Sequence, residues 1–170
     1  MHIAGQSSGE ISFENPTTDI NSNAVSTIKL LDYAIKTKCQ RFIYASTMSV
    51  YGEQNQQEIF NELDRVSPKS FYAVGKLASE HYLRIYHEQY GINYTILRYF
   101  NVYGKGEYFK NTTASMVLQF GHQLLAGKNP RLFENSDKIL RDFIYVEDIV
   151  QANVRAMNPK KSGIYNVGTG

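Results

Sequence analysis

A tyrosine and a lysine stand four residues apart at the start of a predicted helix, within Ser-Pro-Lys-Ser-Phe-Tyr-Ala-Val-Gly-Lys (67–76). This spacing places Tyr72 and Lys76 on one face of the helix, where their side chains can interact. An ammonium group beside a phenol stabilises the phenolate and lowers a pKa that is otherwise about 10, so the tyrosine can move a proton at neutral pH. With 13 tyrosines in 170 residues, chance alone supplies roughly one such pair, so the surrounding residues must decide.

Hydrophobic periodicity predicts an alternation of strands and helices along the chain. Apolar runs bounded by polar residues are expected to form buried strands at 41–45, 93–98, 131–133, 143–145 and 163–167. Apolar residues at helical spacing predict helices at 16–37, 69–90, 113–126 and 146–157. Strands that alternate with helices indicate a parallel sheet covered on both faces, so the expected fold class is α/β.

Thr47 and Asn101 directly follow two of the expected strands. In open parallel sheets, ligands bind beyond the carboxyl ends of the strands. Both side chains are therefore expected at the ligand-binding edge of the sheet.

Composition and charge narrow the functional class. The 170 residues are 42% hydrophobic and 20% charged with a net charge of +2, and no basic stripe points to nucleic acid. The apolar runs are far shorter than the roughly 18 residues of a membrane span, so no membrane partner is expected. The single Cys39 excludes an internal disulfide and fits a reducing cytoplasm. The four histidines are scattered, so no metal site is expected.

No Gly-x-Gly-x-x-Gly or Gly-x-x-Gly-x-x-Gly motif occurs among the 12 glycines. The chain begins on what reads as an interior strand and stops directly after the strand at 163–167. We therefore expect a piece of a longer protein, without the strand, glycine loop and helix that bind a dinucleotide pyrophosphate.

Five separated blocks in one order carry a family resemblance. They are His-x-Ala-x-Gln-Ser-Ser (2–8), Tyr-Ala-Ser-Thr with Val-Tyr-Gly (44–52), Tyr-x-x-x-Lys (72–76), Arg-Tyr-Phe-Asn-Val-Tyr-Gly (98–104) and Arg-Asp-Phe-Ile-Tyr-Val (141–146). Together they resemble the extended short-chain dehydrogenase/reductase superfamily, in its nucleotide-sugar epimerase and dehydratase branch. This resemblance implies a Rossmann-like doubly wound parallel sheet that lacks the first βαβ unit and the C-terminal substrate segment. Residues 1–170 would then be a partial NAD(P)-binding domain with part of the substrate-binding region.

The resemblance also assigns roles for catalysis. Tyr72 resembles the catalytic acid/base, and Lys76 the residue that holds the nicotinamide ribose of NAD or NADP and depresses that tyrosine's pKa. Thr47 resembles the residue that hydrogen-bonds the reacting sugar hydroxyl, with Ser46 beside it as a possible substitute that would also face the cofactor.

Binding residues follow from the same resemblance. The loop at Ala4, Gly5 and Gln6, with Asn23 on the next helix, resembles the wall against the dinucleotide. Phe100 matches the aromatic that packs the nicotinamide, although the residues alone equally allow a core aromatic.

Asn101 and Arg141 resemble the residues that contact the sugar diphosphate, since a guanidinium fork suits phosphate. For Arg141, a surface ion pair with Asp142 is the alternative reading.

The second half is most similar to the ADP-glycero-manno-heptose 6-epimerases, which supply heptose precursors for lipopolysaccharide. There Lys110 resembles a second acid/base, with a solvated loop lysine as the alternative. The remaining residues implied to bind the nucleotide sugar are Thr112, Phe133, Glu134, Asn135 and Ser136. The first half is closer to the UDP-glucose 4-epimerases.

The expected function is therefore a nucleotide-sugar epimerase that uses bound NAD(P) as a transient hydride acceptor, with ADP-heptose as the first substrate candidate. A UDP-glucose 4-epimerase, or another sugar-nucleotide epimerase or dehydratase, is the alternative. A non-catalytic fragment and a dinucleotide-binding redox sensor stay open, the latter disfavoured because Tyr72 and Lys76 are both intact. The resemblance further implies a homo-oligomer formed through the helices at 16–37 and 69–90.

Overall fold

A computed structural model describes residues 1–52, 59–132, 136, 140–158 and 162–170. Its central sheet has three parallel strands in the order β1 (Arg41–Thr47), β2 (Asn93–Tyr99) and β5 (Gly163–Val167). A single parallel bridge from His2 to Tyr44 continues the sheet beyond β1. The expected parallel α/β sheet is confirmed.

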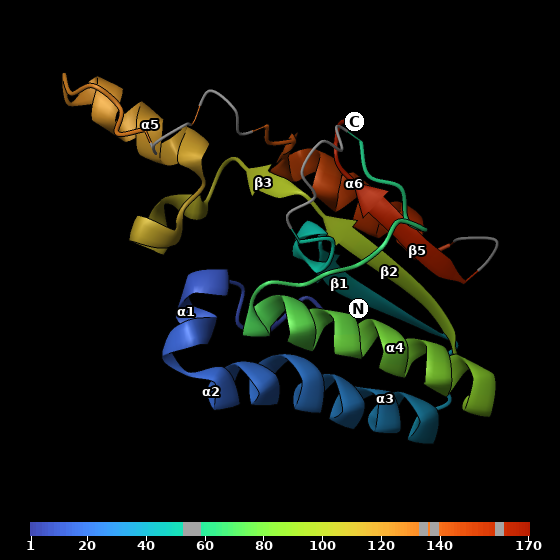
Figure 1. The fold of residues 1–170 in the computed structure, drawn as a ribbon. Helices are drawn as coiled ribbons and strands as arrows, with labels where there is room; N and C mark the ends of the chain where they lie inside the picture. The colour runs from blue at the N-terminus through green and yellow to red at the C-terminus, as the bar shows by residue number, and fades with distance from the viewer. Residues whose placement is uncertain (53–58, 133–135, 137–139, 159–161) are drawn as a thin grey trace.

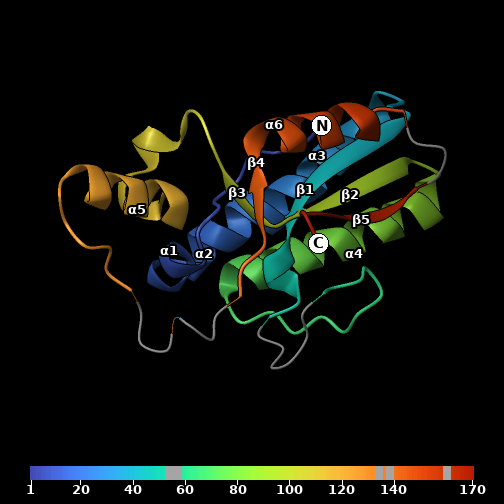
Figure 2. The same cartoon turned by 90° about the horizontal axis from the view of Figure 1, so that it is seen from above.

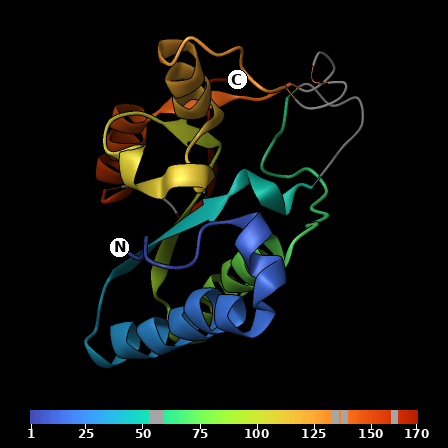
Figure 3. The ribbon, with the colours of Figure 1, turned by 90° about the vertical axis from the view of Figure 1, so that its left-hand side faces the viewer.

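Helices cover both faces of this sheet (Figures 1 and 3). On one face, α2 (Pro16–Ile20), the π-helical turn η1 (Asn21–Val25) and α3 (Ser26–Lys36) run together beside α4 (Phe71–Tyr90). On the other face lies α6 (Val146–Ala156). Each face has its own core, and the fully or nearly buried side chains include Leu31, Leu83 and Ile96 under α3 and α4, and Ile43, Leu97 and Ile149 under α6.

A second, two-stranded parallel sheet joins β3 (Asn101–Tyr103) to β4 (Phe143–Tyr145). The sequence predicted β4 but no strand at residues 101–103. Between these strands, the 3-10 helix η3 (Glu107–Thr113) leads into α5 (Met116–Leu125), which stands apart from the main layers (Figures 1 and 2). The helix expected at 113–126 therefore begins later than predicted.

Two further short elements differ from the expectation. Helix α1 (Gly9–Glu14) lies before the first predicted helix and was not expected, and the Ser8 hydroxyl caps its first turn at the Ile11 amide, 3.3 Å away. Residues 131–132 form no strand, and residue 133 lies outside the described residues. The long helix α4 ends as predicted at Gly91, whose φ of 73° suits a residue without a side chain.

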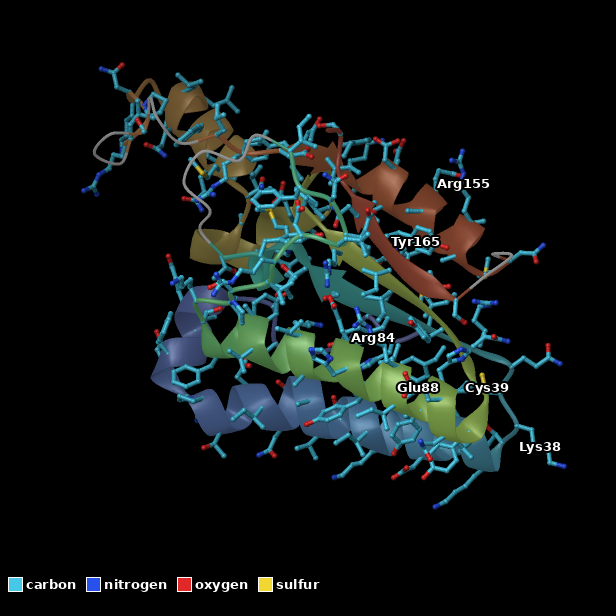
Figure 4. All side chains as sticks on the ribbon, turned by 45° about the vertical axis from the view of Figure 1, so that its right-hand side comes forward. Lys38, Cys39, Arg84, Glu88, Arg155 and Tyr165 are labelled. Carbon is cyan, nitrogen blue, oxygen red and sulfur yellow. The ribbon has the colours of Figure 1, made fainter. Side chains whose placement is uncertain are left out.

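The two ends of the central sheet differ in character. Figure 4 shows Lys38 and Cys39 near the ends of α3 and α4, where β1 begins. Cys39 is exposed there, and the carboxyl ends of the strands lie at the far end of the sheet. No helix among the described residues is long and apolar enough to cross a membrane.

Candidate active site

A cavity of about 340 Å³ opens at the carboxyl end of the sheet. It begins where β1 passes into the 3-10 helix η2 (Met48–Val50). Its lining residues are Thr47, Met48, Ser49, Gly52, Lys69, Ser70, Phe100, Asn101 and Arg141. Four predicted residues from three separate sequence blocks, Thr47, Phe100, Asn101 and Arg141, thus share one cavity.

Tyr72 enters from the first turn of α4. The Ser70 hydroxyl accepts a hydrogen bond from the Ala73 amide at 3.1 Å and so fixes where the helix begins. This start places Tyr72 one residue inside the helix, next to the cavity-lining Ser70. The Tyr72 hydroxyl interacts with the side chain of Thr47, which brings the predicted acid/base and hydroxyl-binding residues together.

Lys76 lies one turn further along α4, with only 4% of its surface exposed. Its Nζ donates to the Ala45 carbonyl at 3.0 Å and lies 4.9 Å from the centre of the Tyr44 ring. The distance to the centre of the Tyr72 ring is 5.9 Å. The predicted proximity is therefore present, but the ammonium group is directed at β1.

The pKa of Tyr72 is not lowered as the sequence predicted. Burial raises it, the hydrogen bond with Thr47 lowers it, and the charge of Asp19 raises it, with a net rise above 10.0. Burial also lowers the pKa of Lys76 from 10.5 to about 8, although Asp19 opposes this shift. The expectation failed because Lys76 points to the Ala45 carbonyl and both groups are desolvated.

Thr47 is positioned by the turn that follows it. Its hydroxyl accepts from the Ser49 amide at 3.1 Å and bonds the Ser49 hydroxyl at the same distance. Ser46, one residue earlier, points to the opposite face of the strand, as alternation requires. Its hydroxyl donates to Glu80 at 2.5 Å in the core, and Ser46 is not among the residues that line the cavity.

The loop of residues 4–6, which is predicted to lie against the cofactor, is held in place by a hydrogen bond from Asn23. The Asn23 amide group donates to the Gln6 carbonyl at 3.1 Å and so holds the loop of residues 4–6 against η1. Ala4 and Gly5 are exposed on this loop. Gly5 has a φ of 146°, and a Cβ there would collide with the Asn23 Oδ1 atom. A glycine is thus required at this close approach.

Asn101 and Arg141 occupy the predicted substrate side. The Asn101 side chain donates to the Asp142 carbonyl at 2.7 Å, which fixes it in the cavity wall. The Asp142 carboxylate accepts from the amide and hydroxyl of Thr169 at 2.6–3.0 Å and from the Gly170 amide at 3.2 Å. Burial raises the pKa of Asp142, but these bonds lower it below its ordinary value. The geometry favours Arg141 as an exposed cavity residue over its ion pair with Asp142.

The remaining predicted residues are not brought into this cavity. Lys110 is exposed on η3, and Ser136 is half-buried, but neither lines the cavity. The Thr112 side chain, Phe133, Glu134 and Asn135 lie outside the described residues. Among the residues that the structure describes, no group of three or more His, Cys, Asp or Glu side chains could hold a metal ion.

A comparison with known protein families decides the assignment. Residues 1–168 match the NAD dependent epimerase/dehydratase family. The chain belongs to this family. The family predicted from the five sequence blocks is confirmed.

The chain spans about half the length of the relatives that it matches. It is 36% identical over 171 residues to a putative UDP-glucose 4-epimerase of Methanocaldococcus jannaschii, covering 100% of this chain and 55% of that protein. It is 40% identical over 134 residues to an ADP-L-glycero-D-manno-heptose-6-epimerase of Brachyspira hyodysenteriae, covering 76% and 42%. The solved Thermus thermophilus UDP-glucose 4-epimerase complex with NAD superposes with a TM-score of 0.89 at 35% identity, covering 99% and 55%.

The residues present fit the nicotinamide end of NAD, the cofactor that the family name implies. A lysine ammonium can donate three hydrogen bonds, and Lys76 makes one to Ala45 within the part of the chain that the structure describes. Two N–H groups are thus left for ribose hydroxyls. Gly5 is exposed on the loop that Asn23 supports, and Phe100 offers an aromatic ring at the cavity.

Sequence reasoning missed a buried polar network beneath the cavity. Arg98 pairs with Glu80 at 2.6 Å, and its guanidinium also donates to the Tyr51 hydroxyl at 2.9 Å. The Tyr51 hydroxyl in turn donates to Asn166 at 2.7 Å. The available signal was a charged residue within a buried strand, because arginine is almost never fully buried without a partner.

Proposed function

We propose that this chain provides the proton-transfer and substrate-gripping half of a nucleotide-sugar epimerase. The observation that carries the proposal is the interaction of Tyr72 with Thr47, because Thr47 lines a cavity together with Asn101 and Arg141. A proton carrier thus lies beside a hydroxyl-binding group, and that group shares a cavity with a cation that can bind a diphosphate. Family membership supports the same reaction class.

Tyr72 is the group that moves the proton. Its phenolate accepts the proton of a secondary alcohol on the sugar while the Thr47 hydroxyl holds that alcohol in place. When bound, NAD would supply the hydride acceptor and donor. Because the pKa of Tyr72 is raised in the structure as it stands, the phenolate needs a cation nearby. Bound NAD would supply positive charge through its nicotinamide ring, and the Lys76 Nζ atom, 5.9 Å from the centre of the Tyr72 ring, is a second and more distant cation.

Epimerisation follows if the sugar rotates to present its other face and the proton transfer then runs in reverse. Tyr72 returns the proton to the carbonyl oxygen once hydride has been delivered to the opposite face of the carbon, and the configuration is inverted. Arg141 grips the diphosphate during this rotation, since its guanidinium can bind two phosphate oxygens at once.

UDP-hexose is the favoured substrate class, and ADP-heptose is the second candidate. The putative UDP-glucose 4-epimerase relative aligns with the entire chain, whereas the heptose epimerase aligns with 76% of it. Lys110, whose role as a second acid/base was specific to the heptose reading, is exposed and does not line the cavity. We assign NAD as the cofactor because the family carries that name.

The test is turnover of UDP-glucose and of ADP-heptose by the protein supplied with NAD, with epimer ratios followed by NMR. We expect UDP-glucose to be epimerised and Tyr72→Phe to lower the rate by about 10²–10⁴-fold, because only the acid/base hydroxyl is removed. Tyr90→Phe, an exposed tyrosine at the far end of α4, is the matched control. Full activity in Tyr72→Phe would overturn the mechanism, and turnover of ADP-heptose alone would reverse the order of substrates.

Fluorescence titration with NADH tests the alternative in which the chain is a non-catalytic fragment. Stoichiometric binding would refute that alternative. Binding without turnover of any sugar nucleotide would instead support the redox-sensor reading that Tyr72 and Lys76 disfavour.

A further inference from the structure

Asp19 is a carboxylate buried beside the candidate active site, and none of the roles above uses it. It belongs to α2, and 1% of its surface is exposed. Its Oδ1 atom accepts a hydrogen bond from the Asn23 side chain at 3.2 Å. Its Oδ2 atom is buried and has no hydrogen-bond partner among the described residues. A buried, unpartnered carboxylate oxygen is costly, so a specific reason for it is required.

The first oxygen of Asp19 connects to the predicted cofactor wall. The side-chain amide of Asn23 donates two hydrogen bonds, one to Asp19 and one to the Gln6 carbonyl at 3.1 Å, and these two bonds fix its position. Asp19 therefore orients the side chain that holds the loop of residues 4–6. The π-helical turn η1, which contains Asn23, directly follows Asp19 and brings the two side chains onto one face.

The second oxygen of Asp19 faces the catalytic helix. A Cβ on Gly75 would lie 3.5 Å from the Oδ2 atom, so this oxygen contacts α4 between Tyr72 and Lys76. The charge of Asp19 raises the pKa of both residues. For Lys76 this opposes burial, which lowers the pKa to about 8. Burial also raises the pKa of Asp19 itself, whereas the hydrogen bond from Asn23 and the charge of Lys76 lower it, so Asp19 and Lys76 each favour the charged form of the other.

Other titratable groups around Lys76 do not provide this charge. On β1, the Tyr44 ring lies under the Lys76 ammonium group, and burial raises the pKa of its hydroxyl. In the N-terminal segment, burial and then Lys76 lower the pKa of His2, which favours its neutral form. One turn along α4, Glu80 is bound to Arg98 and Ser46. The acidic and basic residues of α1 and α3 that flank this region are exposed, namely Glu10, Glu14, Lys29, Asp32 and Lys36.

We propose that Asp19 is a positioning residue of the active site, which supplies the buried negative charge that holds Lys76 protonated and the hydrogen bond that fixes Asn23 against the cofactor loop. This deepens the proposed function and rests on it for the link to catalysis. The effect on Lys76 itself is independent of the reaction.

Asp19→Asn separates the two roles, because asparagine removes the charge and can still accept the hydrogen bond from Asn23. The measurement is NMR titration of the protein labelled with ¹³C at the lysine Cε positions, with Lys76→Gln identifying the Lys76 signal. We expect the Lys76 midpoint to move to lower pH by on the order of one unit in Asp19→Asn. Asp19→Glu, which keeps the charge, should restore part of the shift, and Asp148→Asn on the exposed end of α6 should leave the midpoint unchanged.

The wild-type protein gives a test that does not depend on a variant folding. The carboxyl ¹³C signal of Asp19 should report an ionised group above pH 7 and show a second inflection at the Lys76 midpoint. An Asp19 carboxyl that stays protonated through this range, or a Lys76 midpoint that is the same in Asp19→Asn, would overturn the proposal.

The catalytic part of the proposal is read from the pH profile of epimerisation. The alkaline limb should move to lower pH in Asp19→Asn, in step with Lys76, which a purely structural loss would not produce. If the wild type turns over no sugar nucleotide while the lysine midpoint still responds, the proposed function has failed and the electrostatic role of Asp19 stands.

Discussion

Lys76 is a cation held where burial disfavours its charge. Its folded pKa of about 8 lies below the ordinary 10.5, so the folded state binds fewer protons than the unfolded state between these values. Burial of such a group lowers the free energy of unfolding by its full amount below pH 8, and this loss disappears as the pH rises toward 10.5. Groups that are costly to stability in this way are common at functional sites, which fits the role given to Lys76.

Lys76→Met tests this cost directly. Methionine keeps an apolar stem but carries no charge, so the variant gains stability relative to wild type mainly at low pH. We expect the difference in unfolding free energy, variant minus wild type, to decrease by on the order of 3 kcal/mol between pH 7 and pH 10.5. Urea unfolding at several pH values measures it, with Lys29→Met on the exposed side of α3 as the control. A difference that does not change with pH would contradict the lowered pKa.

At the scale of single residues, strand ends were the predictable part of the site. Thr47 is the last residue of β1 and Asn101 lies two residues beyond β2, and the pairing of these two strands carries both residues to the same edge. The direction of a side chain was not predictable in the same way. Lys76 bonds the Ala45 carbonyl, and Ser46 bonds Glu80, because of partners that only the packed structure brings near.

At the scale of elements, the buried Arg98–Glu80 pair connects α4 to β2. Arg98 makes two bonds to the Glu80 carboxylate, at 2.6 and 3.0 Å, and one to the Glu62 carbonyl at 3.2 Å. The same carboxylate receives the Ser46 hydroxyl from β1. The carboxylate of Glu80, on α4, therefore fixes β1 and β2 to that helix.

A double-mutant cycle tests this connection. Removing either partner leaves a buried charge unpaired, so Arg98→Met and Glu80→Leu should each lower the unfolding free energy by about 3–5 kcal/mol. The double variant should lose much less than the sum of the two. Urea unfolding of all four proteins measures the coupling. The exposed pair Lys105–Glu147, at 3.4 Å, is the matched control, and its loss should cost under about 1 kcal/mol. Additive losses at Arg98 and Glu80 would show that the pair is not coupled.

All the long elements could be predicted from the sequence, but only some of the short ones could. The four long helices and the strands β1, β2 and β5 follow from apolar patterns over many residues, and the three-residue β4 was predicted from its own apolar run. By contrast, α1 depends on a single capping hydroxyl, and β3 depends on pairing with a strand some forty residues away. Short elements of this kind are decided by tertiary contacts, to which local patterns are insensitive.

At the scale of the whole molecule, the sequence predicted the parallel sheet with helices on both faces, but it could not place the apolar surface that remains uncovered. In the single chain, α3 and α4 lie side by side on the outside of the sheet (Figure 1). Their outer surface includes large apolar side chains that are 40–65% exposed, namely Leu30, Tyr33, Val74, Ile85 and Tyr90. Helix α5, on the opposite side of the molecule, has a second exposed apolar set, namely Val117, Leu124 and Leu125. Either set could become buried in an assembly.

We expect the α3–α4 surface to be the one that pairs two copies, as the family resemblance implies. An arginine introduced into the centre of an apolar interface leaves a buried charge without a partner, so Leu30→Arg and Ile85→Arg should each convert the dimer to a monomer. Sedimentation equilibrium across a range of protein concentrations measures the change, and circular dichroism checks that each variant is folded. Leu125→Arg, an equally drastic change on the 88% exposed position of α5, is the matched control and should leave the dimer intact. A monomer in Leu125→Arg alone would move the interface to α5, and a wild type that is monomeric at every concentration would remove both surfaces from consideration.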